Sequence, residues 1–264
     1  MQENQETNIV LPPSPNTAEI SGIIAEPPVY SHRMYQELFY IMRVEIARLS
    51  GGCDFIPVIL SEKLTAGKNL AVGCSVQITG QVRSHILHVN HVRHKYVAVF
   101  ALKIETGRRL LPCTANNRIS LSGKVTNLPE LRITPKGRTV ADIELAVRRY
   151  YHKMDFIPLV IWNRNALALS GRPAGLWLNI TGRIQSREFQ RKNAEGTLEN
   201  GLSIEISVSQ MKIGEDPEQT EQAQYIADPP SVYHASGPEG PAAADSPDVP
   251  GRAAAVTFPV TPAG

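Results

Sequence analysis

Aromatic and basic side chains share one face of two predicted strands in the second half of this 264-residue sequence. In DFIPLVIW (155–162), alternation with period two puts Phe156 and Trp162 on one face and Ile157 and Leu159 on the other. In LNITGRIQSREF (178–189), the face opposite the aliphatic residues carries a mixed set: Arg183, Gln185, Arg187 and Phe189. Aromatic rings stack on nucleic-acid bases, at about 1–3 kcal/mol per base, and arginines bind phosphates. The face therefore has the chemistry of a surface that binds one nucleic-acid strand.

More candidate contacts lie at a strand end and in two predicted loops. In RRYY (148–151), alternation turns Arg148 and Tyr150 outward, but strand ends often bulge, so Tyr150 and Tyr151 are both candidates for stacking, and Arg148 and Arg149 for phosphate contacts. The predicted loops 132–138 and 190–201 add five bases: Arg132, Lys136, Arg138, Arg191 and Lys192. In a competing interpretation the aromatics pack against another subunit and the loops are only solvated. The interleaved arginines favour nucleic acid, because interface cores are depleted in charge.

A long repeat organises the chain. DFIPV at 54–58 recurs 101 residues later as DFIPL at 155–159, and Ser21-Gly22 recurs at the same offset as Ser122-Gly123. Such a long period indicates duplication of a whole small domain. The expected division is a disordered N-terminus (1–16), a first domain (17–105), a linker (106–117), a second domain (118–214) and a disordered acidic tail rich in Pro and Ala (215–264).

Each copy contains five short segments that are rich in β-branched residues and alternate with period two, which predicts strands. In the first copy they are Ile20–Ala25, Phe39–Ala47, Phe55–Leu60, Ser75–Val82 and Val97–Ile104. In the second they are Arg118–Thr126, Thr139–Arg148, Phe156–Trp162, Leu176–Ile184 and Leu202–Met211, with a short helix at Asn163–Ser170. This pattern predicts an all-β chain of two tandem OB-folds, which are five-stranded Greek-key barrels. The alternative, an immunoglobulin-like sandwich, requires about seven strands.

The first copy has lost most of the aromatic face. Phe55 matches Phe156 and Arg83 is a retained base, but Ser61 stands where the second copy has Trp162, and Leu87 where it has Phe189. We therefore expect Phe55 and Arg83 to form at most a weaker site. Asp54 and Asp155 open the third strand of each copy and are interpreted as strand-edge carboxylates.

Charge and composition limit the class of partner. Residues 215–264 hold eight acids and one base out of totals of 25 and 27, so the tail carries −7 and the rest about +9. A basic body suggests a polyanionic partner. We expect no membrane association, since no apolar run reaches about 18 residues, and no secretory signal is present. Three scattered cysteines fit a reducing compartment, so a cytoplasmic, nucleoid-associated protein is expected.

Motifs for metal binding and catalysis are missing from the sequence. His85, His88, His91 and His94 recur every three residues, but on a strand such steps alternate between faces, so no metal site is expected. The sequence has no phosphate-binding glycine loop, no GxSxG and no HExxH motif. We therefore expect neither an enzyme nor a cofactor.

The segment Arg118–Ile213 resembles the bacterial single-stranded DNA-binding protein family, whose domain is an OB-fold. The matching runs are RISLSGKVTNLPELRITPKGRTVADIELAVRRYY, DFIPLVIWNRNA and ITGRIQSREF. The resemblance implies that four aromatics stack DNA bases, namely Tyr151, Phe156, Trp162 and Phe189, and it prefers Tyr151 over Tyr150. The first copy, with DFIPVILSEKL, resembles the N-terminal half of a tandem-OB subgroup from Gram-positive bacteria.

The resemblance implies sequence-tolerant, non-catalytic binding of single-stranded DNA in replication, recombination or repair. A homodimer of tandem chains would supply four barrels, and replication or repair proteins are further expected partners. The tail ends TFPVTPAG rather than in the family's acidic Pro-Phe tip. Two alternatives stay open: an RNA-binding or primosomal OB protein, and an oligomeric scaffold whose outward aromatics form a protein interface.

Overall fold

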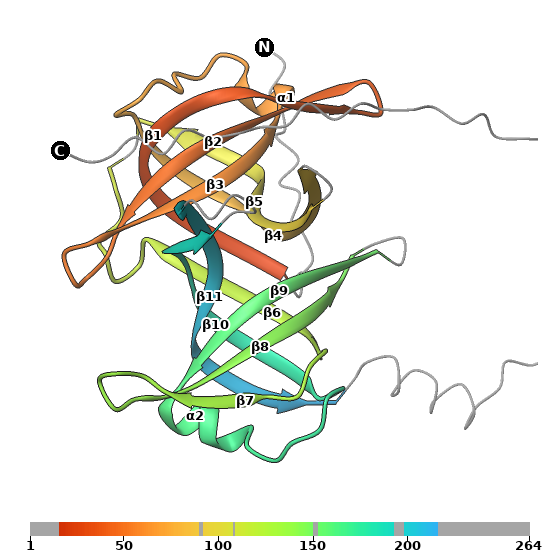
Figure 1. Cartoon of the computed structure of the whole chain (residues 1–264). Helices are drawn as coiled ribbons and strands as arrows, with labels where there is room; N and C mark the ends of the chain where they lie inside the picture. The colour runs from red at the N-terminus through yellow and green to blue at the C-terminus, as the bar shows by residue number, and fades with distance from the viewer. Residues whose placement is uncertain (1–15, 90–91, 108, 150–152, 193–197, 216–264) are drawn as a thin grey trace, which may run out of the picture. The chain divides into compact units, whose positions relative to one another are not determined.

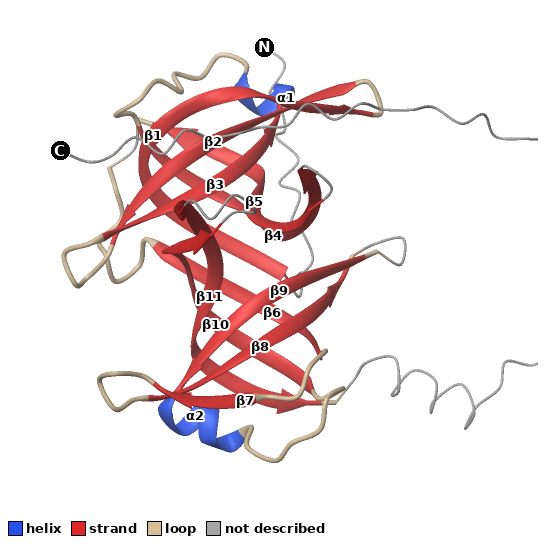
Figure 2. Cartoon of the chain, in the orientation of Figure 1, coloured by secondary structure: helices blue, strands red, loops and turns tan. Residues whose placement is uncertain are grey.

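The computed structural model of the chain describes residues 16–89, 92–107, 109–149, 153–192 and 198–215. The first half of these residues forms a closed barrel with one helical turn (Figures 1 and 2): β1 (Asn16–Met34), β2 (Glu37–Ala47), β3 (Cys53–Ser61), α1 (Glu62–Thr65), β4 (Ser75–Val89) and β5 (Val92–Thr106). Antiparallel pairs join β1 to β2, β2 to β3, β4 to β5 and β1 to β4. A short parallel pairing of β3 with β5 closes the ring.

The second half repeats this barrel and adds one strand: β6 (Asn117–Val125), β7 (Glu130–Ile133), β8 (Thr139–Arg148), β9 (Met154–Trp162), α2 (Asn163–Ala168), β10 (Trp177–Lys192) and β11 (Leu198–Gly214). Antiparallel pairs join β6 to β8, β8 to β9, β10 to β11 and β10 to β6. A parallel pairing of β11 with β9 closes this ring too. The predicted fold class, two tandem OB-fold barrels, is confirmed.

Strand boundaries differ from the prediction where loops were expected. Part of the predicted loop 132–138 belongs to β7, which pairs with β8 to form a hairpin. All of the described part of the predicted loop 190–201 is strand, because β10 and β11 stay paired out to Lys192 and Leu198. β1 runs past the predicted end at Ala25, with register shifts around Pro27 and Pro28, which have no N–H to donate to the ladder. The sequence pattern did not reveal these strand segments because they are polar. Strands of a hairpin that lie outside the core need no alternation of apolar and polar residues.

Strand alternation explains the core of each barrel. The inward positions of β8 and β9, such as Leu145, Ile157, Leu159 and Ile161, are at most 1 % exposed. Equivalent positions on β2 and β3, such as Val44 and Ile56, are fully buried in the first barrel. Burial of each such side chain contributes about 1.5–3 kcal/mol, so the alternating aliphatic residues fix which face of every strand points outward.

Two repeated glycines explain why Ser-Gly and Ile-Thr-Gly recur in both halves. A Cβ atom on Gly22 or Gly123 would lie 2.2 or 2.4 Å from a backbone carbonyl oxygen, and one on Gly80 or Gly182 would lie 2.2 or 2.3 Å from another. Gly80 and Gly182 each also lie at a register shift of the long hairpin. Backbones approach so closely at these bends that only glycine fits.

We expect Gly182→Ala to lower the free energy of unfolding by about 1–3 kcal/mol, because the added methyl group would meet the Ser207 carbonyl and force the backbones apart. Gly52→Ala is the matched control, since the nearest heavy atom to its Cβ would be the Arg48 Cδ at 4.0 Å. Urea unfolding followed by circular dichroism measures both. Equal effects of the two substitutions would contradict the close-approach explanation.

β1 pairs with β6 as well, and this pairing joins both barrels into one 11-stranded sheet. In its register Ala18 lies opposite Ile119, its own counterpart in the repeat, Asn16 lies opposite Leu121, and Ile20 lies opposite Asn117. The offset of 101 residues exchanges the Asn16–Leu121 and Ile20–Asn117 pairs and maps the Ala18–Ile119 pair onto itself. The two barrels are therefore related by an approximate twofold axis that passes near the Ala18–Ile119 pair.

Asp54 and Asp155 are not strand-edge carboxylates, and that interpretation was wrong. Their exposed fractions are 1 % and 0 %. Asp54 accepts a hydrogen bond from the Ser186 N–H (2.7 Å), and Asp155 accepts one from the Ser84 N–H (2.6 Å). Asp54 on β3 and Asp155 on β9 are thus each bonded to the long hairpin of the other barrel, and both carboxylates are buried where the two barrels meet.

Within the described residues, no helix is both long and apolar enough to cross a membrane. The predicted disordered N-terminus and the acidic tail lie outside the described residues, apart from Asn16 and Glu215.

Candidate nucleic-acid interface

The outward side chains of the second barrel lie on five neighbouring strands in the order β10-β11-β9-β8-β7. On this outward surface, the Trp162 Nε1–H at the end of β9 donates a hydrogen bond to the Ser207 Oγ on β11 (3.0 Å). Ser207 is in turn paired with Arg183 on β10, so the indole and the exposed guanidinium lie on either side of one serine. We call the surface formed by Trp162, Arg183, Arg187, Phe189 and Ser207 the outer face. The hydrogen bond fixes the indole edge and leaves the ring partly exposed.

Phe189 lies further along β10, opposite Gly201 on β11. Its ring is 38 % exposed, and a Cβ atom on Gly201 would lie only 2.5 Å from it. The ring therefore rests directly on the backbone of β11 and presents its other side outward. A ring held flat in this way has little rotamer freedom to lose when a base stacks on it.

A carboxylate that the sequence interpretation missed lies between the aromatic and basic groups. Glu205 on β11 is 8 % exposed and accepts a hydrogen bond from the Gln185 Nε2–H (2.7 Å). The Arg187 Nε lies 3.6 Å from its second oxygen. Glu205 therefore orients Gln185 and Arg187 across the outer face. The alternation in SIEISVS (203–209) contained the signal, since it places Glu205 on the same face as Ser207.

Phe156 begins the exposed side of β9, where the first barrel approaches it. Its ring is 37 % exposed, as outward alternation predicts. Its backbone N–H donates to the Ser84 Oγ of β4 at 2.8 Å, so a residue of the first barrel fixes its position. No local sequence signal relates Ser84 to Phe156, because the two lie 72 residues apart.

Arg149, predicted as a phosphate contact, is instead committed to protein groups. Its Nε–H donates to Asp155 (2.6 Å) and its Nη2 donates to the Ser84 carbonyl (3.0 Å) and to Asp155. Burial alone would raise the pKa of Asp155, but the hydrogen bonds from Arg149 and the Ser84 N–H hold that pKa below its ordinary value of 3.8. The carboxylate therefore stays charged at neutral pH, and Arg149 serves to hold the two barrels together.

The β7–β8 hairpin carries the predicted bases Arg132, Lys136 and Arg138, all of them exposed. Arg132 donates to both oxygens of Asp142 on β8, which leaves its guanidinium at the surface. Arg148 is exposed at the end of β8. Tyr150 and Tyr151 lie outside the described residues, as do the side chains of Arg191 and Lys192.

The corresponding face of the first barrel is filled by its own side chains. Phe39 is 4 % exposed, and its ring centroid lies 5.0 Å from that of His32 and 5.8 Å from that of Phe100. Phe39 is paired with Ser61, the position that corresponds to Trp162. Phe55 is half-buried, and its N–H donates to the Ser186 Oγ (3.0 Å). Aromatic residues thus remain on this barrel, but they stack on one another.

Arg83, the base expected to contribute a weaker contact, lies at the boundary between the barrels. It donates to Asp155 (3.1 Å) and to Gln81, and burial is the main cause that lowers its pKa. Among the described residues, no group of three or more His, Cys, Asp or Glu side chains is placed to hold a metal ion.

Comparison with known proteins agrees with this arrangement. The model of the single-strand binding protein family matches residues 116–213. This segment is the second barrel from its first strand to its last. Curated proteins that are similar to this chain include single-stranded DNA-binding proteins of Oceanobacillus iheyensis (37 % identical over 86 residues) and Clostridium tetani (38 % identical over 84 residues). These alignments cover 30 % and 29 % of this chain, and the chain spans only 53 % and 58 % of the length of those relatives.

A solved structure extends the likeness in fold to the first barrel. The wild-type single-stranded DNA binding protein from Thermus aquaticus aligns with a TM-score of 0.59 and 19 % identity. The alignment covers 76 % of this chain and 93 % of that one, which is more than one barrel of this chain can supply. The two-barrel architecture therefore occurs in a protein with little sequence in common, while the single-strand binding protein family match is confined to the second barrel.

Proposed function

We propose that this protein binds single-stranded DNA on the outer face of the second barrel, without catalysis and without sequence preference. The observation that carries the proposal is the placement of Trp162 and Phe189, two partly exposed rings fixed against β11, beside the exposed Arg183 and Arg187. Rings of this kind stack on bases of any sequence, and arginines beside them bind the phosphates. The names of the curated relatives, which are single-stranded DNA-binding proteins, support the same function.

The proposed contacts are divided between bases and backbone. Stacking is assigned to Phe156, Trp162 and Phe189, with Tyr151 or Tyr150 as a fourth group from the family resemblance. Phosphate contacts are assigned to the exposed bases of the second barrel: Arg132, Lys136, Arg138, Arg148, Arg183 and Arg187. Arg191 and Lys192 extend this set by their position at the end of the β10–β11 hairpin. Arg149 is left out because Asp155 and Ser84 use its donors.

We further infer that the protein acts on the exposed strands of replication, recombination or repair, in the cytoplasm and at the nucleoid. Two barrels in one chain support a homodimer that presents four barrels. Replication or repair proteins are the partners that fit such a role. Sedimentation velocity of the full chain measures the stoichiometry, and a monomer at micromolar concentration would remove the homodimer from the proposal.

The direct test is fluorescence of the Trp177→Phe protein, in which Trp162 is the one remaining tryptophan. We expect saturable quenching by a long oligo-dT, because a base stacked on the indole quenches it. The logarithm of the affinity should fall with the logarithm of the salt concentration with a slope of about −6, at about −0.7 for each of the eight proposed phosphate contacts. Absence of both quenching and binding would overturn the proposal.

An RNA-binding function is the alternative that shares this site. The aromatic and arginine side chains of the outer face suit either nucleic acid, so the preference for DNA rests on the names of the curated relatives. Competition between oligo-dT and oligo-U for the same protein measures it. Tighter binding of oligo-U would move the proposal to RNA.

A further inference from the structure

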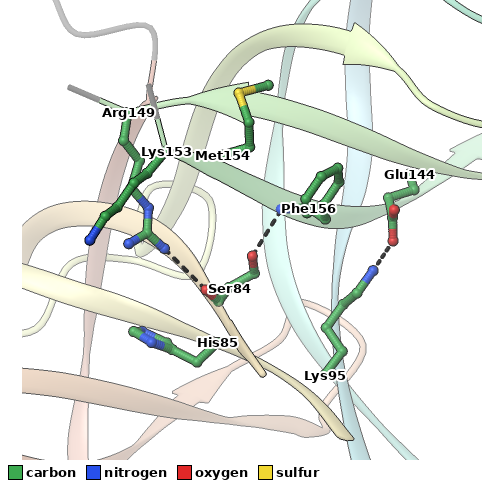
Figure 3. Close-up of a pocket in the computed structure, with 8 residues that line it drawn as sticks. All are labelled: Ser84, His85, Lys95, Glu144, Arg149, Lys153, Met154 and Phe156. Carbon is green, nitrogen blue, oxygen red and sulfur yellow. Dashed lines mark hydrogen bonds and ion pairs between the residues drawn. The ribbon is translucent and has the colours of Figure 1, made fainter. Parts of the chain in front are cut away.

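A hollow of about 750 Å³ lies where the first barrel meets Phe156 (Figure 3). This volume falls in the range of small-molecule sites, about 300–1,000 Å³. Both barrels line it. The first barrel supplies Ser84, His85 and Lys95, and the second supplies Glu144, Arg149, Lys153, Met154 and Phe156.

Phe156 forms the aromatic wall of this hollow. Its ring is partly exposed, and its N–H is tied to the Ser84 Oγ by the hydrogen bond drawn in Figure 3. Arg149, drawn on the other side of Ser84 in Figure 3, donates to the Ser84 carbonyl. β4 of the first barrel therefore sets the orientation of a stacking ring that belongs to the second barrel.

The charge of the hollow favours an anion. Three bases line it, Lys95, Arg149 and Lys153, but Asp155 already neutralises Arg149. Lys95 forms an ion pair with Glu144 across the two barrels, and Lys153 lies on the opposite side of the hollow, so one positive charge is left over. The side chains of Lys95 and Glu144 are 38 % and 33 % exposed, and ion pairs that are open to water contribute little. A phosphate group can therefore replace Glu144 as the partner of Lys95 at small cost.

His85 lines the hollow on the side of the first barrel, next to Ser84. Burial, followed by the nearby charge of Arg149, lowers the pKa of His85 to about 4, so the ring is neutral at pH 7. The ring therefore adds no positive charge to the hollow, and the attraction for an anion comes from the lysines.

We infer that one nucleotide of the bound strand occupies this hollow, with its base against Phe156 and its phosphate at Lys95. The inference rests on the proposed function and gives the first barrel a direct part in it. That barrel's own outer face is filled by Phe39 and Phe100, so its contribution comes from the β4–β5 hairpin instead.

The test compares two lysines of the same strand in the full chain. Lys95→Ala is expected to weaken oligo-dT binding about 3–10-fold at moderate salt and to reduce the salt slope by about 0.7, the loss of one phosphate contact. Lys103→Ala is the matched control, because Lys103 is also on β5, is 69 % exposed and is paired with Glu105 at 2.9 Å, outside the hollow. It removes the same charge and is expected to change affinity less than twofold.

The opposite change sharpens the test. Glu144→Gln should tighten binding about two- to fourfold, because it removes the acid that competes with a phosphate for Lys95 and that repels the phosphate. Its effect should largely disappear in the Lys95→Ala background, since residues that share one partner are not additive. Glu105→Gln serves as its control. Additive effects of Glu144→Gln and Lys95→Ala would overturn the inference.

The possible failures are separable. If the wild-type chain does not bind oligo-dT, the proposed function itself fails. If the wild type binds and Lys95→Ala behaves like Lys103→Ala, the proposed function stands and only the site between the barrels is wrong.

Discussion

Asp155→Asn is expected to lower the free energy of unfolding by about 3–5 kcal/mol, the usual cost of removing one partner of a buried ion pair. Asp155 is fully buried and accepts hydrogen bonds from Arg149, from the Arg83 Nη1 (3.1 Å) and from the Ser84 N–H (2.6 Å). Asparagine has nearly the same shape, so it opens no cavity. It leaves two largely buried guanidinium groups without a counter-charge and turns an amide toward them. Urea unfolding at pH 7 measures the change.

Asp142→Asn is the matched control for this prediction. Asp142 also accepts two hydrogen bonds from one arginine, Arg132, but its side chain is 46 % exposed. Pairs exposed to water contribute about 0–1 kcal/mol, so the control should lose no more than that. If both substitutions cost the same, the buried carboxylate does not hold the barrels together.

The pH dependence of stability gives the same prediction a second measurement. The pKa of Asp155 is lowered in the folded protein, so the unfolded chain binds the proton first as pH falls. The contribution of Asp155 is therefore complete above its ordinary pKa of 3.8 and is lost as pH falls through the lower folded value. The difference in stability between wild type and Asp155→Asn should accordingly be constant near neutral pH and shrink only in strong acid.

Trp162→Ala is expected to weaken binding of oligo-dT about 5–150-fold, which corresponds to the loss of about 1–3 kcal/mol from one stacked base. The indole is partly exposed and its edge is fixed by Ser207, so the substitution removes the stacking surface and little of the core. Trp162→Phe should retain most of the affinity, because the phenyl ring still stacks and only the hydrogen bond to Ser207 is lost. Fluorescence anisotropy of labelled oligo-dT measures all three proteins.

Trp177→Ala is the matched control, since it removes the same side chain at the start of β10, beside Gly214 of β11 and outside the outer face. It should leave affinity within about twofold of wild type. Sedimentation of Trp162→Ala separates DNA binding from a scaffold function. A scaffold that uses the outward aromatics as an interface would change its oligomeric state on losing Trp162, whereas a DNA-binding protein would keep it.

The sequence by itself determined the repeated fold and the composition of the binding face. Period-two alternation was enough to identify ten strands and to turn Phe156, Trp162, Arg183, Arg187 and Phe189 outward. The reason is that each barrel is built from short strands with one buried face. Burial of the aliphatic residues on that face fixes the residues between them on the outward face. The repeated glycine at positions 80 and 182 likewise reflects a close approach between the backbones of two paired strands in each barrel.

Local pattern failed where segments lie outside a core. β7 and the far ends of β10 and β11 are held by hairpin ladders, which leave little periodicity in the sequence, so they were predicted as loops. The first barrel was expected to have lost most of the aromatic face. Which aromatic residues fill its face could not be predicted from the repeat, because Phe39 and Phe100, on β2 and β5, occupy positions at which the second barrel has no aromatic residue.

Contacts between the barrels were decided by the tertiary structure alone. Arg149 and Asp155 look like a surface base and a strand-edge acid until the β4–β5 hairpin covers them. Ser84 fixes Phe156 across 72 residues of sequence, and Lys95 meets Glu144 from the other barrel. Strand alternation reports only which face of a strand is buried. What covers that strand depends on the approximate twofold axis through β1 and β6, and no stretch of sequence shorter than the whole repeat contains it.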